Sequence, residues 1–323
     1  MFGADLAFLP APSAREKAYL RRFGASYCAR GTDVVMHSAA GLLLCSRGRI
    51  HPVHFYVCNP VSGQWVALPE LPCPSEEWQS GLLRVHTDDG DAAKKPNKFQ
   101  VLLMNHPLHW RTPGGCFDLR LFSSDTGQWK TIQLQPPSPI LDGFPDWSSI
   151  GQSTGTVCWI ASIEGEDHAT LYNSDEHSVV GVIRLPHVIG NGIYRHCCIG
   201  ERHGGGLRYA RSNNSVVEVW DSQTKVGDNM WTLVHRIGIA QLLEQNPEVA
   251  SIRPWQRTEV AVSFHPTDDD VVFLGISSGP VAAYSIQNGT TNLHQLTHEN
   301  AFFLVTCLCF FSSIGYVWQG YLI

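Results

Sequence analysis

A repeated pattern constrains the fold of this chain more than any single motif does. The stretch FYVCNPVSGQWVALPEL, residues 55–71, reads as a strand, a tight turn and a second strand, with a tryptophan just after the turn. The stretch LRLFSSDTGQWKTIQL, residues 119–134, has the same order and again places Gly-Gln-Trp after a short apolar run. Two such hairpins in one chain predict an architecture built from structural repeats.

Five similar units follow one another along the chain, each with a buried-looking strand and then a hairpin. The predicted strands cover residues 41–45, 98–105, 155–162, 205–211 and 271–277. One aromatic residue recurs in each hairpin: Tyr56, Phe122, Tyr172, Trp220 and Tyr284. Their spacing suits one four-stranded blade of a β-propeller, roughly 40 to 50 residues, plus loop insertions. We therefore predict an all-β propeller of four-stranded antiparallel blades, with five units visible and about six expected, the sixth completed by the two termini.

The tryptophans near the turns are expected to pack between blades rather than to bind a ligand. A propeller blade is apolar on both faces, so large flat side chains at the seam bury the most area. This expectation applies to Trp65, Trp129 and Trp231. Gly63 and Gly127 are expected to supply the positive φ that a tight hairpin needs.

Composition excludes several classes of protein. The 323 residues are 43% hydrophobic and 16% charged, which is too apolar for a disordered chain. The net charge of −6 and the lack of a basic run argue against a nucleic-acid partner. The 10 cysteines form no C-x-x-C, and the N-terminus lacks the apolar core of a signal peptide. We expect buried thiols in a reducing compartment, cytoplasmic or nuclear.

Several stretches, in this order, resemble the F-box-associated β-propeller of plant F-box proteins, a Kelch-like domain. They are GLLLC (41–45), YVCNPVSGQWVALP (56–69), LFSSDTGQW (121–129), GTVCWIA (155–161), LRYAR (207–211) and FHPTDDDVVFL (264–274). The resemblance covers about residues 38–296. It implies a non-catalytic protein-interaction module that recognises a substrate protein for an SCF-type ubiquitin ligase, with no cofactor.

The chain departs from that family pattern at both ends. The family's F-box, reading like L-P-x-x-L/I-x-x-x-I-L with a later C-K-x-W, is not found before Gly41. We therefore expect a Skp1-type adaptor to bind only if an F-box is supplied upstream. The family's closing segment is usually polar and contains proline, unlike residues 301–323 here. The expected division is a poorly ordered segment 1–37, a propeller 38–300 and an apolar tail 301–323.

No cluster of metal-ligating residues has convincing spacing. The densest patch is His196, Cys197, Cys198 and His203, but zinc needs four converging ligands, and adjacent cysteines in a strand point to opposite faces. Cys307 and Cys309 share a face but have no evident partner nearby, so they too are expected in the core. Asp268, Asp269 and Asp270 lack EF-hand spacing and suit a solvated hairpin turn better than a calcium site.

The remaining polar motifs also favour turns over chemistry. The run Gly204-Gly205-Gly206 lacks the Lys-Ser/Thr and helix of a phosphate loop and precedes a predicted strand. Asp88, Asp89 and Asp91 lie in a polar insertion, and His265 is expected to be a turn residue. There is no G-x-S-x-G and no H-E-x-x-H. We therefore expect no catalytic, cofactor or metal site. The alternative is a propeller enzyme, a hydrolase or oxidase, with residues converging on the central channel.

The last 23 residues, 301–323, carry no charge and leave two interpretations open. Their length suits a membrane span, which would make the protein a membrane-tethered scaffold. Their Phe, Val, Ile and Tyr content, two glycines and lack of flanking Lys or Arg favour a closing strand of the ring. We favour the strand, so no membrane partner is expected. The protein partner itself and its binding face are not readable from the sequence.

Overall fold

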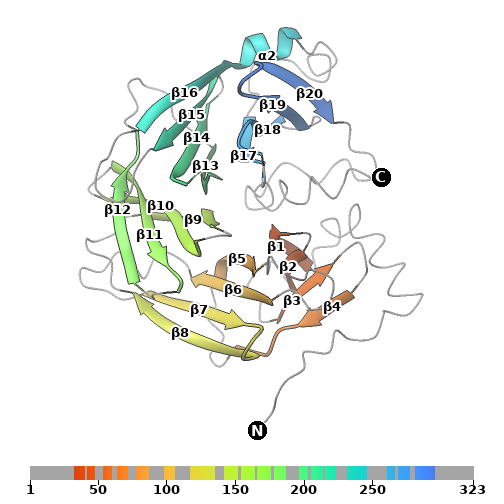
Figure 1. Ribbon diagram of the computed structural model, residues 1–323, viewed down its shortest axis with the longest axis vertical. Coiled ribbons are helices and arrows are strands. Elements are labelled where there is room, and N and C mark those ends of the chain that lie inside the picture. Colours follow the sequence, from red (N-terminus) through yellow and green to blue (C-terminus); the bar gives the residue numbers. More distant parts are fainter. Residues whose placement is uncertain are drawn as a thin grey trace.

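Five four-stranded antiparallel sheets surround a common axis as blades of a β-propeller (Figure 1). The computed structural model describes residues 33–40, 42–47, 54–59, 64–71, 78–86, 98–105, 117–134, 142–151, 154–163, 166–175, 178–186, 196–202, 205–213, 215–222, 231–245, 260–265, 268–276 and 281–294. Within each sheet the strands follow chain order from the innermost to the outermost. The predicted all-β fold of four-stranded blades is therefore confirmed, with five blades in the described part of the chain.

The strand bounds define the blades. Blade 1 contains β1 (Asp33–Ala39), β2 (Leu42–Arg47), β3 (His54–Asn59) and β4 (Gln64–Ala67). Blade 2 contains β5 (Trp78–His86), β6 (Lys98–Asn105), β7 (Phe117–Ser123) and β8 (Gln128–Leu134). Blade 3 contains β9 (Asp142–Ile150), β10 (Thr156–Ile163), β11 (Glu166–Asn173) and β12 (Ser178–Arg184). Blade 4 contains β13 (His196–Glu201), β14 (Leu207–Ser212), β15 (Val216–Ser222) and β16 (Trp231–Gly238). Blade 5 contains β17 (Val260–Phe264), β18 (Val271–Ile276), β19 (Val281–Ser285) and β20 (Thr290–His294).

Neighbouring blades contact each other near the axis through their innermost strands. β1 contacts β5, β5 contacts β9, β9 contacts β13, and β13 contacts β17. Glycines allow this close approach: a Cβ on Gly81 of β5 would meet Met36 and Leu44 of blade 1 at 3.0 Å. A Cβ on Gly200 of β13 would meet Phe264 of blade 5 at 3.2 Å. Small side chains near the axis therefore let the blades converge.

The second strand of each blade is buried on both faces, and its side chains alternate between the two adjoining seams. In β6, Val101 and Leu103 pack toward blade 1, whereas Leu102 and Met104 pack toward blade 3. All four side chains are 0% exposed. This two-sided burial explains why these strands read as continuous apolar runs rather than as alternating ones. Burying such side chains stabilises the fold by about 1.5 to 3 kcal/mol each.

In blades 2 and 5 the third and fourth strands are joined by short turns with a shared hydrogen-bond pattern. In blade 2 the Gly127 amide donates to the Ser123 carbonyl at 2.9 Å, and in blade 5 Gly289 donates to Ser285 at 2.9 Å. Gly127 has φ 65° and Gly289 has φ 64°, in the left-handed region that favours glycine. The predicted positive φ at Gly127 is thus confirmed, and Gly63 lies outside the described residues.

Of the three tryptophans expected between blades, Trp129 and Trp231 lie in seams, as predicted, whereas the described neighbours of Trp65 all belong to blade 1. The rings of Phe122 and Trp129 contact each other at a tilt, with centroids 5.4 Å apart, and pack against blade 1, where the Phe55 ring lies 6.4 Å from Trp129. Trp231 packs against blade 3, and its indole N–H donates to the Arg184 carbonyl at 2.8 Å. The Trp129 indole donates likewise to the Pro69 carbonyl at 2.7 Å. These side chains serve packing between blades.

The recurring aromatics Tyr56 and Phe122 do not occupy equivalent positions in their blades, which corrects the sequence-based pattern. Tyr56 and Trp65 do make an edge-to-face contact, with 6.3 Å between ring centroids, but they are not opposite each other in the sheet. Trp65 pairs with Cys58, whereas Trp129 pairs with Phe122. Cys58 is therefore the register equivalent of Phe122, and Tyr56 lies two residues farther from the turn. Equivalent positions in two blades are those at the same distance from the turn, whatever type of residue occupies them.

Helix content is low in the described part of the chain. The short helix α2 (Ile239–Gln245) buries Ile239, Leu242 and Leu243 against the seam of blades 4 and 5. β1 begins at Asp33, inside the segment 1–37 that the sequence suggested to be poorly ordered. No helix in the described ranges is both long enough and apolar enough to span a bilayer. The tail 301–323 lies outside those ranges.

Candidate functional site

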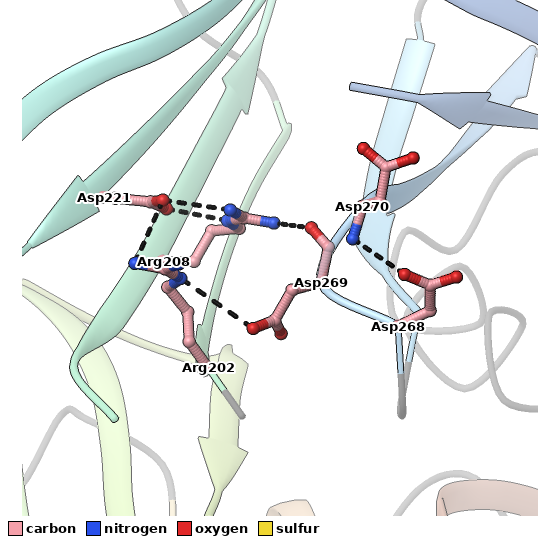
Figure 2. A network of polar contacts seen from close by, with 6 residues as sticks. All are labelled: Arg202, Arg208, Asp221, Asp268, Asp269 and Asp270. Atoms are coloured by element: carbon pink, nitrogen blue, oxygen red, sulfur yellow. Dashed lines mark hydrogen bonds and ion pairs between the residues drawn. The ribbon is translucent and has the colours of Figure 1, made fainter. Parts of the chain in front are cut away.

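Two arginines and two aspartates form a polar network where blades 4 and 5 meet (Figure 2). Arg208, near the start of β14, is the cross-strand partner of Asp221 near the end of β15. The guanidinium donates to both carboxylate oxygens, with Nε 2.7 Å from Oδ1 and Nη2 2.9 Å from Oδ2. Both side chains are buried, and this bidentate geometry is the strong form of an arginine–carboxylate pair.

The same network crosses the seam into blade 5. Arg208 Nη1 donates to the main-chain carbonyl of Asp269, which lies in the turn between β17 and β18. Arg202 Nη1 is 3.3 Å from Asp221 Oδ2, and its Nε is 4.0 Å from Asp269 Oδ2. Burial alone lowers the pKa of Arg208, but the hydrogen bonds and charge of Asp221 outweigh it and raise that pKa. The guanidinium therefore stays charged and holds the two blades together.

In the acidic triplet of blade 5, the carboxylates of Asp268 and Asp270 accept hydrogen bonds from nearby turn residues. The Asp270 carboxylate accepts from the Ser285 hydroxyl at 2.5 Å and from the Gln287 amide at 2.6 Å. The Asp268 carboxylate accepts from the Asp270 amide at 2.9 Å. His265 also belongs to this turn, since its Nδ1 accepts from the Asp268 amide at 3.0 Å. These contacts are those of turn residues, as predicted for both His265 and the triplet, with the difference that Asp269 and Asp270 are only partly exposed.

The predicted cysteine patch divides between two seams. Cys197 packs toward blade 3, whereas Cys198 packs toward blade 5, so the adjacent thiols do point to opposite faces. The Tyr209 hydroxyl donates to Cys197 Sγ at 3.3 Å, and burial raises the pKa of Cys197 to about 12. The side chain of His196 and the whole of His203 lie outside the described residues. Within the described ranges, no group of three or more His, Cys, Asp or Glu could hold a metal ion.

The two described glycines of the run, Gly205 and Gly206, lie in a turn, as predicted. Gly205 and Gly206 have φ 84° and 82°, and β14 follows directly. The Gly205 amide donates to the Arg202 carbonyl at 3.0 Å, which closes the turn and places Arg202 beside Asp221. A Cβ on Gly206 would lie 2.5 Å from the Ser222 carbonyl oxygen. Gly204, Asp88, Asp89, Asp91, Cys307 and Cys309 lie outside the described residues.

Two further buried arginines join blades and were not singled out from the sequence. Arg84 of β5 reaches Asp175 of blade 3 at 2.9 Å and lies over Gly155, where a Cβ would meet Nη1 at 2.2 Å. Arg211 of β14 pairs with Glu218 at 2.9 Å and donates to the Pro186 carbonyl of blade 3 at 2.8 Å. For Arg211, the signal that could have indicated this role is an arginine within an apolar second strand, as in LRYAR.

The described polar clusters thus have a mechanical function: their charges are paired with each other and link one blade to the next. A reactive site would instead need a nucleophile and a base at hydrogen-bonding distance, or ligands converging on a metal. The clusters of Arg84, Arg208 and Arg211 have neither arrangement. The fold and these clusters define a β-propeller whose buried charged residues link neighbouring blades.

Comparison with known proteins places the chain within one family of propellers. Residues 16–307 match the family model described as "F-box protein At3g26010-like, beta-propeller", and the chain belongs to this family. The resemblance to a plant F-box-associated propeller is therefore confirmed. The match extends beyond the described blades at both ends.

Individual relatives are more distant. The chain is 26% identical over 239 residues to the F-box protein At5g03970 of Arabidopsis thaliana, covering 73% of this chain and 53% of that protein. The chain thus spans about half the length of this curated relative. Among solved structures, a Dos1 propeller matches 81% of this chain and 58% of its own, at 12% identity and a TM-score of 0.41. The Cps50 (Swd1) β-propeller domain of Myceliophteria thermophila matches 80% and 70%, at 9% identity and a TM-score of 0.41.

Proposed function

We propose that this propeller is a non-catalytic protein-interaction module that recognises a substrate protein for an SCF-type ubiquitin ligase. The observation that supports this proposal is membership of a family of F-box protein propellers over residues 16–307. In this proposal the blades form a rigid support, and the loops at their ends contact the partner, because loops on a rigid scaffold suit recognition.

The rigidity of the support has a physical basis in the seams. Each of the four seams between described blades combines apolar side chains from both blades with at least one polar link, such as Arg84 to Asp175 or Arg208 to Asp269. A scaffold held in this way loses little conformational entropy when a partner binds, and affinity benefits from that preorganisation. The partner of this propeller is a protein, which we propose is delivered for ubiquitination through an adaptor bound to an F-box upstream.

The test is affinity purification of the propeller fused behind the F-box of a family relative, followed by mass spectrometry with the proteasome inhibited. A substrate should be enriched with the intact propeller and should carry ubiquitin only when the F-box is present. The matched control is the same fusion with Arg208→Met, which weakens the seam of blades 4 and 5 and should lower recovery of the substrate but not of the adaptor. Recovery of the adaptor without any propeller-dependent protein would contradict the proposal.

The two alternative functions have less support. The charges of the described polar clusters are paired within or between blades, and none of the clusters favours a hydrolase or oxidase. A membrane-tethered scaffold would depend on residues 301–323, which lie outside the described part of the chain.

A further inference from the structure

The outer edge of blade 4 exposes two neighbouring apolar side chains. β16 is the outermost strand of that blade, and among the described strands none pairs with its outer side (Figure 1). Leu233 and Val234 of β16 are 41% and 39% exposed. They are the two exposed large hydrophobic residues among the side chains that the structure describes. Apolar side chains on an unpaired strand edge favour the addition of another strand.

A β-bulge presents both side chains at this edge. Trp220 of β15 lies opposite Leu233, and Val219 lies opposite His235. Val234 is therefore the extra residue of the bulge and lies opposite no residue of β15. Such a bulge redirects side chains locally, and here it leaves two consecutive apolar residues accessible instead of one.

Neighbouring blades hold β16 on both sides of this apolar pair. The Trp231 indole donates to the Arg184 carbonyl of blade 3 at 2.8 Å. On the other side, His235 Nε2 lies 2.6 Å from the Tyr284 hydroxyl of blade 5. The edge is thus fixed before any partner arrives, which lowers the entropic cost of pairing with it.

The outermost strand of blade 2 provides a comparison within the same chain. β8 begins in the same way, because the Trp129 indole also donates to a carbonyl of the preceding blade. The two residues that follow Trp129 are Lys130 and Thr131, and both are exposed. The corresponding residues of β16 are Thr232 and Leu233. Charged and polar side chains, lysine above all, protect an edge from strand addition, so β8 has a protection that β16 lacks.

The exposed charge of β16 is positive and indicates the kind of partner. The Arg236 side chain is 65% exposed, and its Nε lies 3.5 Å from Oε1 of Glu218, a carboxylate shared with the buried Arg211. β16 contains no acidic residue, so a second copy that paired through the same strand would bring no carboxylate to Arg236. A partner strand that carries Asp or Glu supplies one and is complementary in charge.

We propose that β16 accepts an extended, acidic segment of a partner protein as a fifth antiparallel strand of blade 4. Its apolar side chains cover Leu233 and Val234, and its carboxylate pairs with Arg236. In antiparallel pairing this places the acidic residue two or three positions before the apolar ones in the partner. Main-chain hydrogen bonds supply affinity, and the side-chain contacts supply specificity. The inference rests on the proposed function in taking the partner to be a protein, and it adds this edge to the loops as a binding surface.

The probes are peptides selected on the immobilised full chain from a random dodecapeptide display library, then synthesised with a fluorescent label for polarisation measurements. Peptides with the acidic and apolar pattern given above should be enriched. The double variant Leu233→Lys/Val234→Lys should weaken their binding at least about tenfold, because it removes two cross-strand contacts. The matched control places the same charges on exposed positions of β8, Thr131→Lys/Gln133→Lys, and should leave affinity unchanged.

Two further measurements separate strand addition from contact through side chains alone. Methylating the backbone nitrogens at alternate positions of the peptide should abolish binding to the unaltered protein, because a methylated amide cannot donate to a strand edge. Arg236→Glu should weaken binding about tenfold, and replacing the acidic residue of the peptide with lysine should restore it. Urea denaturation checks that each variant is folded.

Three results would overturn the inference: no selected peptide whose binding depends on Leu233 and Val234, full affinity after backbone methylation, or a concentration-dependent dimer that the double variant abolishes. The last would assign the edge to a second copy of this chain. The F-box fusion described above distinguishes this inference from the proposed function. Undiminished substrate recovery by the Leu233→Lys/Val234→Lys fusion contradicts the role of β16 and leaves the proposed function intact. Peptide binding at β16 without any ubiquitinated partner contradicts the proposed function instead.

Discussion

Arg208 illustrates how single residues decide the stability of this propeller. Its guanidinium is buried, bound by both oxygens of Asp221 and linked to the Asp269 carbonyl of the next blade. A buried pair of this kind is weak evidence for net stabilisation, because desolvating two charges is costly. Removing only one partner is different, since it leaves the other charge buried and poorly compensated.

We therefore predict that Arg208→Met lowers the free energy of unfolding by about 3 kcal/mol. The remaining contact of Asp221 with Arg202, at 3.3 Å, compensates its charge only in part. Urea denaturation followed by tryptophan fluorescence measures the change. The double variant Arg208→Met/Asp221→Leu should lose less than the sum of the single variants. Arg236→Met is the control: its side chain is 65% exposed and should contribute little. A double variant that is less stable than that sum would contradict the prediction.

His37 is predicted to make the propeller sensitive to mild acid. Its Nδ1 accepts a hydrogen bond from the Leu83 amide at 3.3 Å, and burial lowers its pKa from 6.5 to about 4. Between these two values the unfolded chain binds a proton that the folded chain excludes. The free energy of unfolding should therefore fall as pH drops from 6.5 toward 4, and this histidine should have no effect above about pH 7.

The loss attributable to His37 at pH 5 should be about 1 to 2 kcal/mol. The measurement compares urea denaturation at pH 7.5 and pH 5 for the parent protein and for His37→Asn. The asparagine side-chain oxygen can accept the same hydrogen bond without titrating. Its stability should thus fall less than that of the parent over this range. An identical pH dependence in the two proteins would exclude His37 as the cause.

At the scale of elements, β14 shows how one strand serves two seams. Leu207, Tyr209 and Arg211 face blade 3, and Arg211 donates to the Pro186 carbonyl there. Arg208, Ala210 and Ser212 face blade 5, where Ser212 donates to the Val260 carbonyl. Alternation along a strand assigns each residue to one neighbour. Inserting one residue at the start of β14 would turn each following side chain to the opposite face of the strand. Arg208 and Arg211 would then each face the wrong neighbouring blade.

The hairpin turns are the elements most directly encoded in the sequence, and Gly127 tests this. Its φ of 65° disfavours any residue with a Cβ, so Gly127→Ala should lower the free energy of unfolding by about 1 to 2 kcal/mol. Gly127→Asn should cost less, because asparagine tolerates the left-handed region better. Thermal or urea denaturation ranks the three proteins. Equal stability of the alanine and glycine forms would show that this turn does not depend on a positive φ.

At the scale of the whole molecule, the family assignment raises the question of the ubiquitin-ligase adaptor. The described part of the chain consists of blades, with α2 as its one described helix. The F-box pattern, a three-helix motif, is not found before Gly41. We predict that residues 1–323 do not bind a purified Skp1-type adaptor directly, and that fusing an F-box upstream produces binding.

A pull-down with purified components checks this prediction. The F-box fused to an unrelated soluble domain is the positive control, and the propeller alone is the test. Stable retention of the adaptor by the propeller alone would show that the blades themselves provide an adaptor-binding surface. The expected result is binding only when the F-box is present, whether or not the propeller carries the Arg208→Met change.

The sequence by itself determined the features that depend on neighbouring residues in the chain. The second strand of every blade was predicted, as were the turns at Gly127 and Gly205 and the aromatics of the hairpins. These features follow from strand periodicity and from turn chemistry, which act over a few residues. The innermost strands, such as β5 and β9, were not recognised as part of the repeating unit. Near the axis they contain glycine and polar residues in place of a recurring apolar pattern.

Only the tertiary structure decided which residues meet across the seams. Arg84 and Asp175 are 91 positions apart, and Arg208 and Asp269 are 61 apart. The register of each sheet and the order of blades bring these groups together, and no local pattern encodes a contact of that range. The same holds for the separation of Cys197 from Cys198 into different seams: alternation predicts opposite faces, but only the packed ring shows which blade each face meets.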